Sequence, residues 1–155
     1  MYFYILKVQL IFYNMTNRIY LTFLLTFFLL ISCNQTITTA DIDKISGYWE
    51  IEKVILADGT KKEYRISETI DYFKIKDNKG FRKKVVPQLD GSYLINNQFE
   101  NIAIVKDKDL YYIKYTTKYT KFKEQIVQIR DSILVLKNAQ NVEYHYKKPI
   151  PFSVK

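Results

Sequence analysis

The stretch Leu-Tyr-Tyr-Ile-Lys-Tyr-Thr at residues 110–116 decides the fold class, because its side chains alternate in character one by one. Tyr111, Ile113 and Tyr115 occupy alternate positions, and Tyr112 and Lys114 lie between them. Successive side chains of a β-strand point to opposite faces, so this pattern predicts a strand with one dry and one wet face. No amphipathic helix of three turns appears anywhere after residue 33.

Runs of the same kind fill the rest of the chain and are separated by short turn signals. Asp90-Gly91 is typical of a hairpin, and Pro87 indicates an edge or a bulge because proline cannot donate to the ladder. The connections are too short for parallel crossovers, which predicts an all-β antiparallel meander of about eight to nine strands. The expected strands are 46–56, 70–76, 81–88, 92–95, 99–105, 110–116, 119–129, 132–136 and 142–147.

An up-and-down sheet of about eight strands removes its open edges by closing into a barrel. At that size the interior is filled by side chains or holds one small ligand. Residues 57–69 are the one connection long enough for a lid or a distorted strand. Before the first strand we expect a single helical turn around Asp41–Ile45, capped by Thr39 or Asp41.

Residues 1–32 are typical of a secretory signal peptide rather than of the fold. They contain no acidic residue, and the apolar run at residues 19–31 follows the positive charge of Arg18. A membrane-spanning helix needs roughly 20 continuous apolar residues, more than this run offers. A start at Met15 would give a signal of ordinary length, so we expect Met15 to be the true start or residues 1–14 to be dispensable.

The tetrapeptide Leu30-Ile31-Ser32-Cys33 follows the apolar run directly and resembles the lipobox of bacterial lipoproteins. The resemblance implies cleavage before Cys33 and attachment of a diacylglyceryl group to its thiol. Bacterial lipoproteins carry two or three acyl chains, which is enough for stable anchoring. Residues 33–41 would then be the lipidated cysteine and a polar tether. The alternatives are an uncleaved N-terminal anchor and a structural cysteine.

Charge and residue counts exclude most catalytic classes. The net charge is +8, and removal of Lys7 and Arg18 with the signal peptide leaves +6. In an envelope compartment this surplus indicates solubility and weak attraction to anionic head groups, not nucleic-acid binding. A single histidine, His145, and a single cysteine leave no catalytic triad and no metal-ligand spacing, and no glycine-rich phosphate loop is present. We therefore expect no enzyme activity, no cofactor and no metal.

The first expected strand opens with Ile45-Ser46-Gly47-Tyr48-Trp49-Glu50-Ile51, and its Gly-x-Trp resembles the lipocalin signature. Residues 126–137 and the final strand 142–147 are similar to the closing strands of lipocalin-like lipoproteins common in Bacteroidetes. The resemblance covers about residues 42–148. It implies a lipocalin-like β-barrel over residues 42–149, followed by a tail of residues 150–155.

The Gly-x-Trp pair has a physical role in such a barrel. Gly47 permits a close approach where the strand enters, and Trp49 plugs the closed end. Lys53 would follow inward at a high cost for an unpaired charge, so we expect a bulge near Glu52–Lys53 that returns Val54 to the interior. The candidate interior residues are Gly47, Trp49, Ile51, Phe73, Ile75, Tyr111, Ile113 and Tyr115.

Two departures from the family stand out. The best-known lipocalins pack an arginine from near the last strand across the tryptophan, whereas that region here offers Lys147 and Lys148. Their long helix after the barrel is missing, because residues 149–155 are few and include two prolines. These departures argue against a deep ligand cup and favour a flattened, filled barrel.

The resemblance and the lipobox together predict a non-enzymatic lipoprotein that binds or carries a small apolar or amphipathic molecule in the cell envelope. The alternative is an envelope interaction or structural module with a filled barrel, whose Tyr/Lys surface docks another protein. No acidic cluster follows Cys33, since the first acid is Asp41. Acidic residues there are associated with surface export in Bacteroidetes-like lipoproteins, so we expect an outer-membrane lipoprotein that faces the periplasm.

Overall fold

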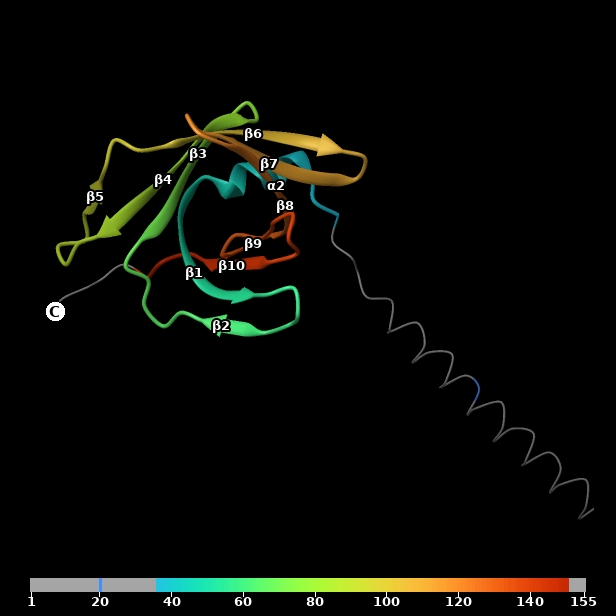
Figure 1. The fold of residues 1–155 in the computed structure, drawn as a ribbon, viewed down its shortest axis with the longest axis horizontal. Helices are drawn as coiled ribbons and strands as arrows, with labels where there is room; N and C mark the ends of the chain where they lie inside the picture. Colours follow the sequence, from blue (N-terminus) through green and yellow to red (C-terminus); the bar gives the residue numbers. More distant parts are fainter. Residues whose placement is uncertain (1–19, 21–35, 151–155) are drawn as a thin grey trace, which may run out of the picture. The chain divides into compact units, whose positions relative to one another are not determined.

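The computed structural model describes Tyr20 and residues 36–150, and the chain from Ile37 onward forms a compact unit of its own. Apart from Tyr20, the expected signal peptide lies outside the described residues, as do Met15, Cys33 and residues 151–155. A short helix α2 (Thr39–Ile42) and a 3₁₀ turn η1 (Asp43–Ile45) precede the strands (Figure 1). None of the described helices is long and apolar enough to cross a membrane. The strands are β1 (Gly47–Ile55), β2 (Lys61–Glu63), β3 (Ile70–Lys76), β4 (Lys79–Pro87), β5 (Tyr93–Ile95), β6 (Glu100–Asp107), β7 (Leu110–Thr116), β8 (Lys121–Ile129), β9 (Ile133–Lys137) and β10 (Glu143–Lys147).

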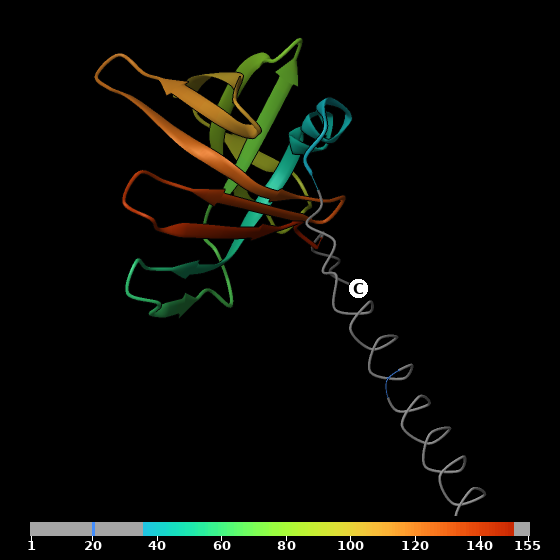
Figure 2. The same cartoon turned by 90° about the vertical axis from the view of Figure 1, so that its right-hand side faces the viewer.

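The described strands form one antiparallel sheet that closes on itself. Neighbours along the sheet follow the order β10-β9-β8-β7-β6-β4-β3-β1, and β1 also pairs with β10. These 8 strands form the closed ring, while β2 pairs only with β1 and β5 only with β4. Figures 1 and 2 show the ring from two directions. The prediction of an all-β antiparallel meander closed into a barrel is confirmed.

Strand β1 changes partners along its length. Its first residues, Gly47–Trp49, pair with β3, and its second half pairs with β10 on one side and β2 on the other. The register with β10 shifts between Ile51 and Lys53, which is the bulge expected from the sequence. As a result Val54 is buried, and Lys53 does not take the inward position that strict alternation would give it.

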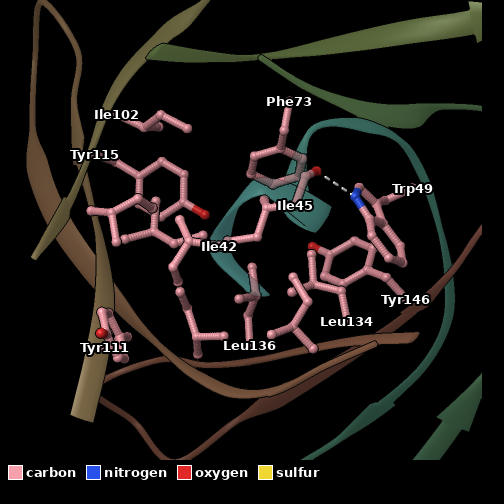
Figure 3. Close-up of a cluster of buried hydrophobic side chains, with 14 residues drawn as sticks. Ile42, Ile45, Trp49, Phe73, Ile102, Tyr111, Tyr115, Leu134, Leu136 and Tyr146 are labelled. Carbon is pink, nitrogen blue, oxygen red and sulfur yellow. Dashed lines mark hydrogen bonds between the residues drawn. The ribbon is translucent and has the colours of Figure 1, made fainter. Parts of the chain in front are cut away.

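Helix α2 and turn η1, together residues 39–45, form a plug at the end of the barrel where β1 begins. Ile42 and Ile45 are buried there, and the Ile45 carbonyl accepts a hydrogen bond of 2.7 Å from the indole Nε1 of Trp49 (Figure 3). The expected cap at Thr39 or Asp41 is wrong, because the N-cap is Thr38 and Asp41 is the N3 residue. The Asp41 carboxylate accepts hydrogen bonds from both the backbone N–H and the hydroxyl of Thr38, which satisfies the first turn.

The long connection at residues 57–69 contains a short strand and a loop. A turn with Gly59 at φ +85° folds β2 back onto β1, and the backbone N–H of Tyr64 donates to the Glu52 carbonyl at 2.8 Å. The chain then crosses to β3 through residues 65–69. Strand β2 thus occupies the place beside the second half of β1 that β3 does not reach.

The half of the barrel next to the plug, which we call the plug half, has a packed apolar cluster as its interior (Figure 3). Its largest members are Trp49, Tyr115 and Phe73, and none of them is more than 1% exposed. The other members are Ile42, Ile45, Ile102, Ile104, Tyr111, Ile113, Ile126, Ile129, Leu134, Leu136 and Tyr146. We call these residues the core cluster.

Candidate binding site

The eight candidate interior residues all lie in the barrel wall. Five of them belong to the core cluster, and two are half-buried and pack against it. Gly47, the eighth, adopts φ +120°, a conformation that favours glycine, and an added Cβ would lie 3.1 Å from Lys148 Nζ. The five are Trp49, Phe73, Tyr111, Ile113 and Tyr115, and the two are Ile51 and Ile75.

Lys148 occupies the place where the family resemblance led us to look for an arginine. Its Nζ lies 3.7 Å from the centroid of the Trp49 ring and 3.4 Å from the Ser46 carbonyl oxygen, to which it donates. Burial lowers the pKa of this lysine. A lysine therefore makes the cation–π contact that closes this end of the barrel.

The opposite half of the barrel, which we call the mouth half, is hollow and polar. A cavity of ≈ 320 Å³ opens where β3 and β8 begin and where β4 nears its end, and we call it the mouth cavity. Of the candidate interior residues only Ile51 lines it. The full lining is Ile51, Ser67, Thr69, Asp71, Arg82, Lys84, Phe122, Glu124, Tyr144 and Tyr146.

Arg82 on β4 is the central cation of the mouth cavity. Its Nε donates to Glu100 on β6 at 2.5 Å, and its guanidinium lies 4.5 Å from the centroid of the Tyr115 ring. Phe122 also stacks on that ring, with the two ring centroids 4.5 Å apart. Burial opposes the charge of Arg82, but Tyr115, Asp71 and Glu100 outweigh this effect and raise its pKa. The guanidinium is therefore a fixed positive charge.

Glu124 on β8 is the carboxylate of the mouth cavity that lacks a close partner. It is 7% exposed, and its nearest cation is Arg82, whose Nη1 lies 4.0 Å from Oε2. Neither Glu124 Oε2 nor the buried hydroxyl of Tyr115 makes a hydrogen bond of good geometry. Burial raises the pKa of Glu124, because it disfavours the ionised form. Figure 3 shows the Tyr115 hydroxyl directed toward the middle of the barrel.

Asp71 on β3 is buried at the rim of the same space and is paired. Its Oδ1 accepts a hydrogen bond of 3.0 Å from Nζ of Lys84, whose side chain is 60% exposed. The loop that follows β2 forms another part of the rim, where the Ser67 hydroxyl donates to the Thr69 carbonyl at 2.6 Å. Residues 57–69, which were expected to form a lid or a distorted strand, therefore contain strand β2 and form part of the cavity wall.

Comparison with known proteins agrees with this geometry. The sequence profile of the lipocalin-like domain family matches residues 45–136. The chain belongs to the lipocalin-like domain family. The structure is also similar to a lipocalin-like protein from Bacteroides uniformis, with 13% identity, a TM-score of 0.44, and coverage of 68% of this chain and 99% of that one. No curated protein sequence matches the chain.

Sequence reasoning missed most of the polar lining of this lipocalin-like barrel, although strand parity contains the signal. Asp71 shares its face with Phe73 and Ile75, which were assigned to the interior. Glu124 has the same relation to Ile126. Neither Asp71 nor Glu124 was among the candidate interior residues, because an apolar core was expected.

The single histidine is on β10, and its polar contact is with Glu143 of the same strand. His145 is half-buried, and its Nε2 lies 3.3 Å from Glu143 Oε2, which also faces Lys137. Within residues 36–150 no group of three His, Cys, Asp or Glu side chains is placed to hold a metal ion. The mouth cavity is therefore the site that we consider for binding.

Proposed function

We propose that this chain is a membrane-anchored envelope lipoprotein whose lipocalin-like barrel binds one small amphipathic molecule in the mouth cavity. The observation that carries the binding role is the cavity of ≈ 320 Å³ within a barrel whose other half is filled. Small-molecule sites span roughly 300–1,000 Å³, so this one suits a ligand at the small end of that range.

The lining favours an amphipathic ligand over a wholly apolar one. Ile51, Phe122 and Tyr144 offer apolar surface, and Asp71 and Glu124 face the same space. A wholly apolar molecule would displace water from these carboxylates and return no hydrogen bond, which is costly. A molecule with one polar end can satisfy both kinds of surface.

The proposed anchor and location rest on Leu30–Cys33 and on the uncharged residues 34–40 that follow. Acylated Cys33 would hold the barrel at the outer membrane, and the absence of acids before Asp41 supports the periplasmic side. Mass spectrometry of the purified protein should find a diacylglyceryl group on Cys33, and Cys33→Ser should release the protein from the membrane fraction. An unmodified Cys33 would overturn the anchor and leave the binding role intact.

The binding role is tested with a chain truncated to residues 34–155, which retains the plug and all ten described strands. Saturation-transfer NMR with aryl alcohols, aryl amines and aryl carboxylates should detect binding of at least one class. Thr69→Trp places a large ring in the mouth cavity and should abolish that binding, whereas Glu68→Trp on the exposed neighbour should preserve it. Absence of binding by every compound, or binding that survives Thr69→Trp, would overturn the role.

The alternative of an interaction module draws support from the outer surface of the barrel. Rings stack across β5, β1 and β3, with centroids 4.2 Å apart for Tyr93 and Tyr48 and 4.7 Å apart for Tyr48 and Tyr72. Leu94 and Phe99 nearby are 64% and 52% exposed. Nothing in the described residues shows what would cover this surface, so the mouth cavity carries the better-supported function.

A further inference from the structure

We propose that the molecule bound in the mouth cavity carries a protonated amine, which pairs with Glu124. This inference rests on the proposed binding role and names the chemical class of the ligand. It follows from the way the charged groups of the cavity are already paired.

The charged side chains around the mouth cavity form two ion pairs and leave one acid over. Arg82 donates to Glu100 at 2.5 Å, and Lys84 donates to Asp71 at 3.0 Å. Glu124 is the remaining carboxylate, with Arg82 Nη1 no closer than 4.0 Å. With all five groups ionised the cavity carries one net negative charge, which a ligand cation would neutralise.

One buried oxygen of the cavity lining defines where the amine would bind. Glu124 Oε2 makes no hydrogen bond of good geometry, and its residue lines the cavity at 7% exposure. The Tyr115 hydroxyl interacts with Glu124 but lies outside the lining, and one phenol hydrogen leaves most acceptor sites of a carboxylate open. A primary ammonium has three N–H donors and no acceptor, and it can therefore supply the further donor that a buried carboxylate normally finds.

The same arrangement disfavours an anion. The guanidinium of Arg82 is held between Glu100 and the Tyr115 ring, and Lys84 is bound to Asp71. A ligand carboxylate could use only the N–H donors that these pairs leave free, and it would lie beside Glu124, whose charge would repel it.

The apolar part of the ligand also has a defined surface. Phe122 lines the cavity and stacks at an interplanar angle of 11° on Tyr115, and Tyr144 and Ile51 line the same space. An aryl or short alkyl group can pack against these side chains while the amine reaches Glu124. A small arylalkylamine fits both requirements.

The experiment uses three probes that share a phenyl ring on a short alkyl chain and differ in their polar group: phenethylamine, 2-phenylethanol and phenylacetate. Isothermal calorimetry near neutral pH measures their affinity for the chain of residues 34–155. Phenethylamine should bind about tenfold or more tightly than 2-phenylethanol, as expected for a hydrogen bond to a buried charge. Phenylacetate should bind most weakly.

A matched pair of variants assigns the preference to Glu124. Glu124→Gln keeps the shape of the side chain and removes its charge, and it should abolish the advantage of phenethylamine over 2-phenylethanol. Glu52→Gln removes a carboxylate from an exposed position of β1 and should leave that advantage unchanged. Circular dichroism establishes that each variant folds, and the order of the three probes on the unmodified chain needs no variant.

The outcomes separate this inference from the binding role on which it rests. If 2-phenylethanol or phenylacetate equals or exceeds phenethylamine, and Thr69→Trp still blocks it, the ammonium assignment is wrong and the binding role stands. If phenethylamine keeps its advantage in Glu124→Gln, the assignment to Glu124 is wrong. If neither these probes nor the broader compound classes bind, both proposals fail.

Discussion

The plug half and the mouth half of this barrel are built on the same strands and have opposite interiors. In the plug half Trp49 and Phe73 are fully buried among apolar neighbours. In the mouth half the wall carries Arg82, Asp71 and Glu124 around a cavity. The change occurs within single strands, since Asp71 and Phe73 are two residues apart on the same face of β3.

This difference separates stability from binding. Apolar burial in the plug half is favourable and needs no partner, so it can stabilise the barrel alone. Buried charge in the mouth half costs free energy unless it is paired, and Glu124 has only a distant partner. A buried, poorly paired charge that lowers stability at one defined place is typical of a binding or catalytic site.

The largest expected effect breaks the plug half. Trp49→Ala removes the biggest buried side chain and its hydrogen bond to the Ile45 carbonyl, and it should lower the free energy of unfolding by about 3–5 kcal/mol. Urea unfolding followed by circular dichroism measures this loss, because Trp49 is the single tryptophan and fluorescence disappears with it. Tyr119→Ala, at a side chain 88% exposed, should change stability by less than about 0.5 kcal/mol.

A smaller effect of opposite sign is expected in the mouth half. Burial raises the pKa of Glu124 above 4.5, so the stability that its protonated form contributes is present below pH 4.5 and lost as the pH rises through the raised pKa. Glu124→Gln should therefore match the parent near pH 4.5 and exceed it in the free energy of unfolding at about pH 8. Urea titrations at several pH values measure this, with Glu52→Gln as the control. A difference that stays constant with pH would contradict the assignment.

The smallest expected effect concerns the boundary of the plug half. Lys148→Met keeps the apolar stem but removes the ammonium 3.7 Å from the Trp49 ring centroid, and it should cost about 0.5–1 kcal/mol. Lys147→Met, at the equally half-buried neighbour, should cost less than about 0.5 kcal/mol, because within residues 36–150 no aromatic ring lies under the Lys147 ammonium. Equal midpoints of urea unfolding for the two variants would mean that the cation–π contact contributes nothing measurable.

Much of the fold could be predicted from local patterns. Alternation along residues 110–116 and the turn signals specify strands and an antiparallel meander, because both depend on neighbouring residues only. The β1 bulge was also predictable, since an inward Lys53 would be costly. The cap at Thr38 was missed because Thr38, Thr39 and Asp41 are all good capping residues, and only the geometry of the turn selects among them.

The mouth cavity could be predicted only in part. Parity places Asp71 and Glu124 on inward faces, but whether such a side chain is solvated or buried depends on partners from other strands. Arg82 meets Glu100 through the pairing of β4 with β6, which passes over β5. No local pattern reports a pairing that skips a strand.

The junction of β1 with β10 has a consequence for how the protein is made. The ladder that completes the ring joins Glu50 to Lys147, close to the two ends of the folded region. A nascent chain still lacking its final segment cannot complete the ring and presents the edges of β1 and β9 to other chains. Ring completion is thus delayed until residues 143–147 have been synthesised, and truncation before Glu143 should produce an aggregating species.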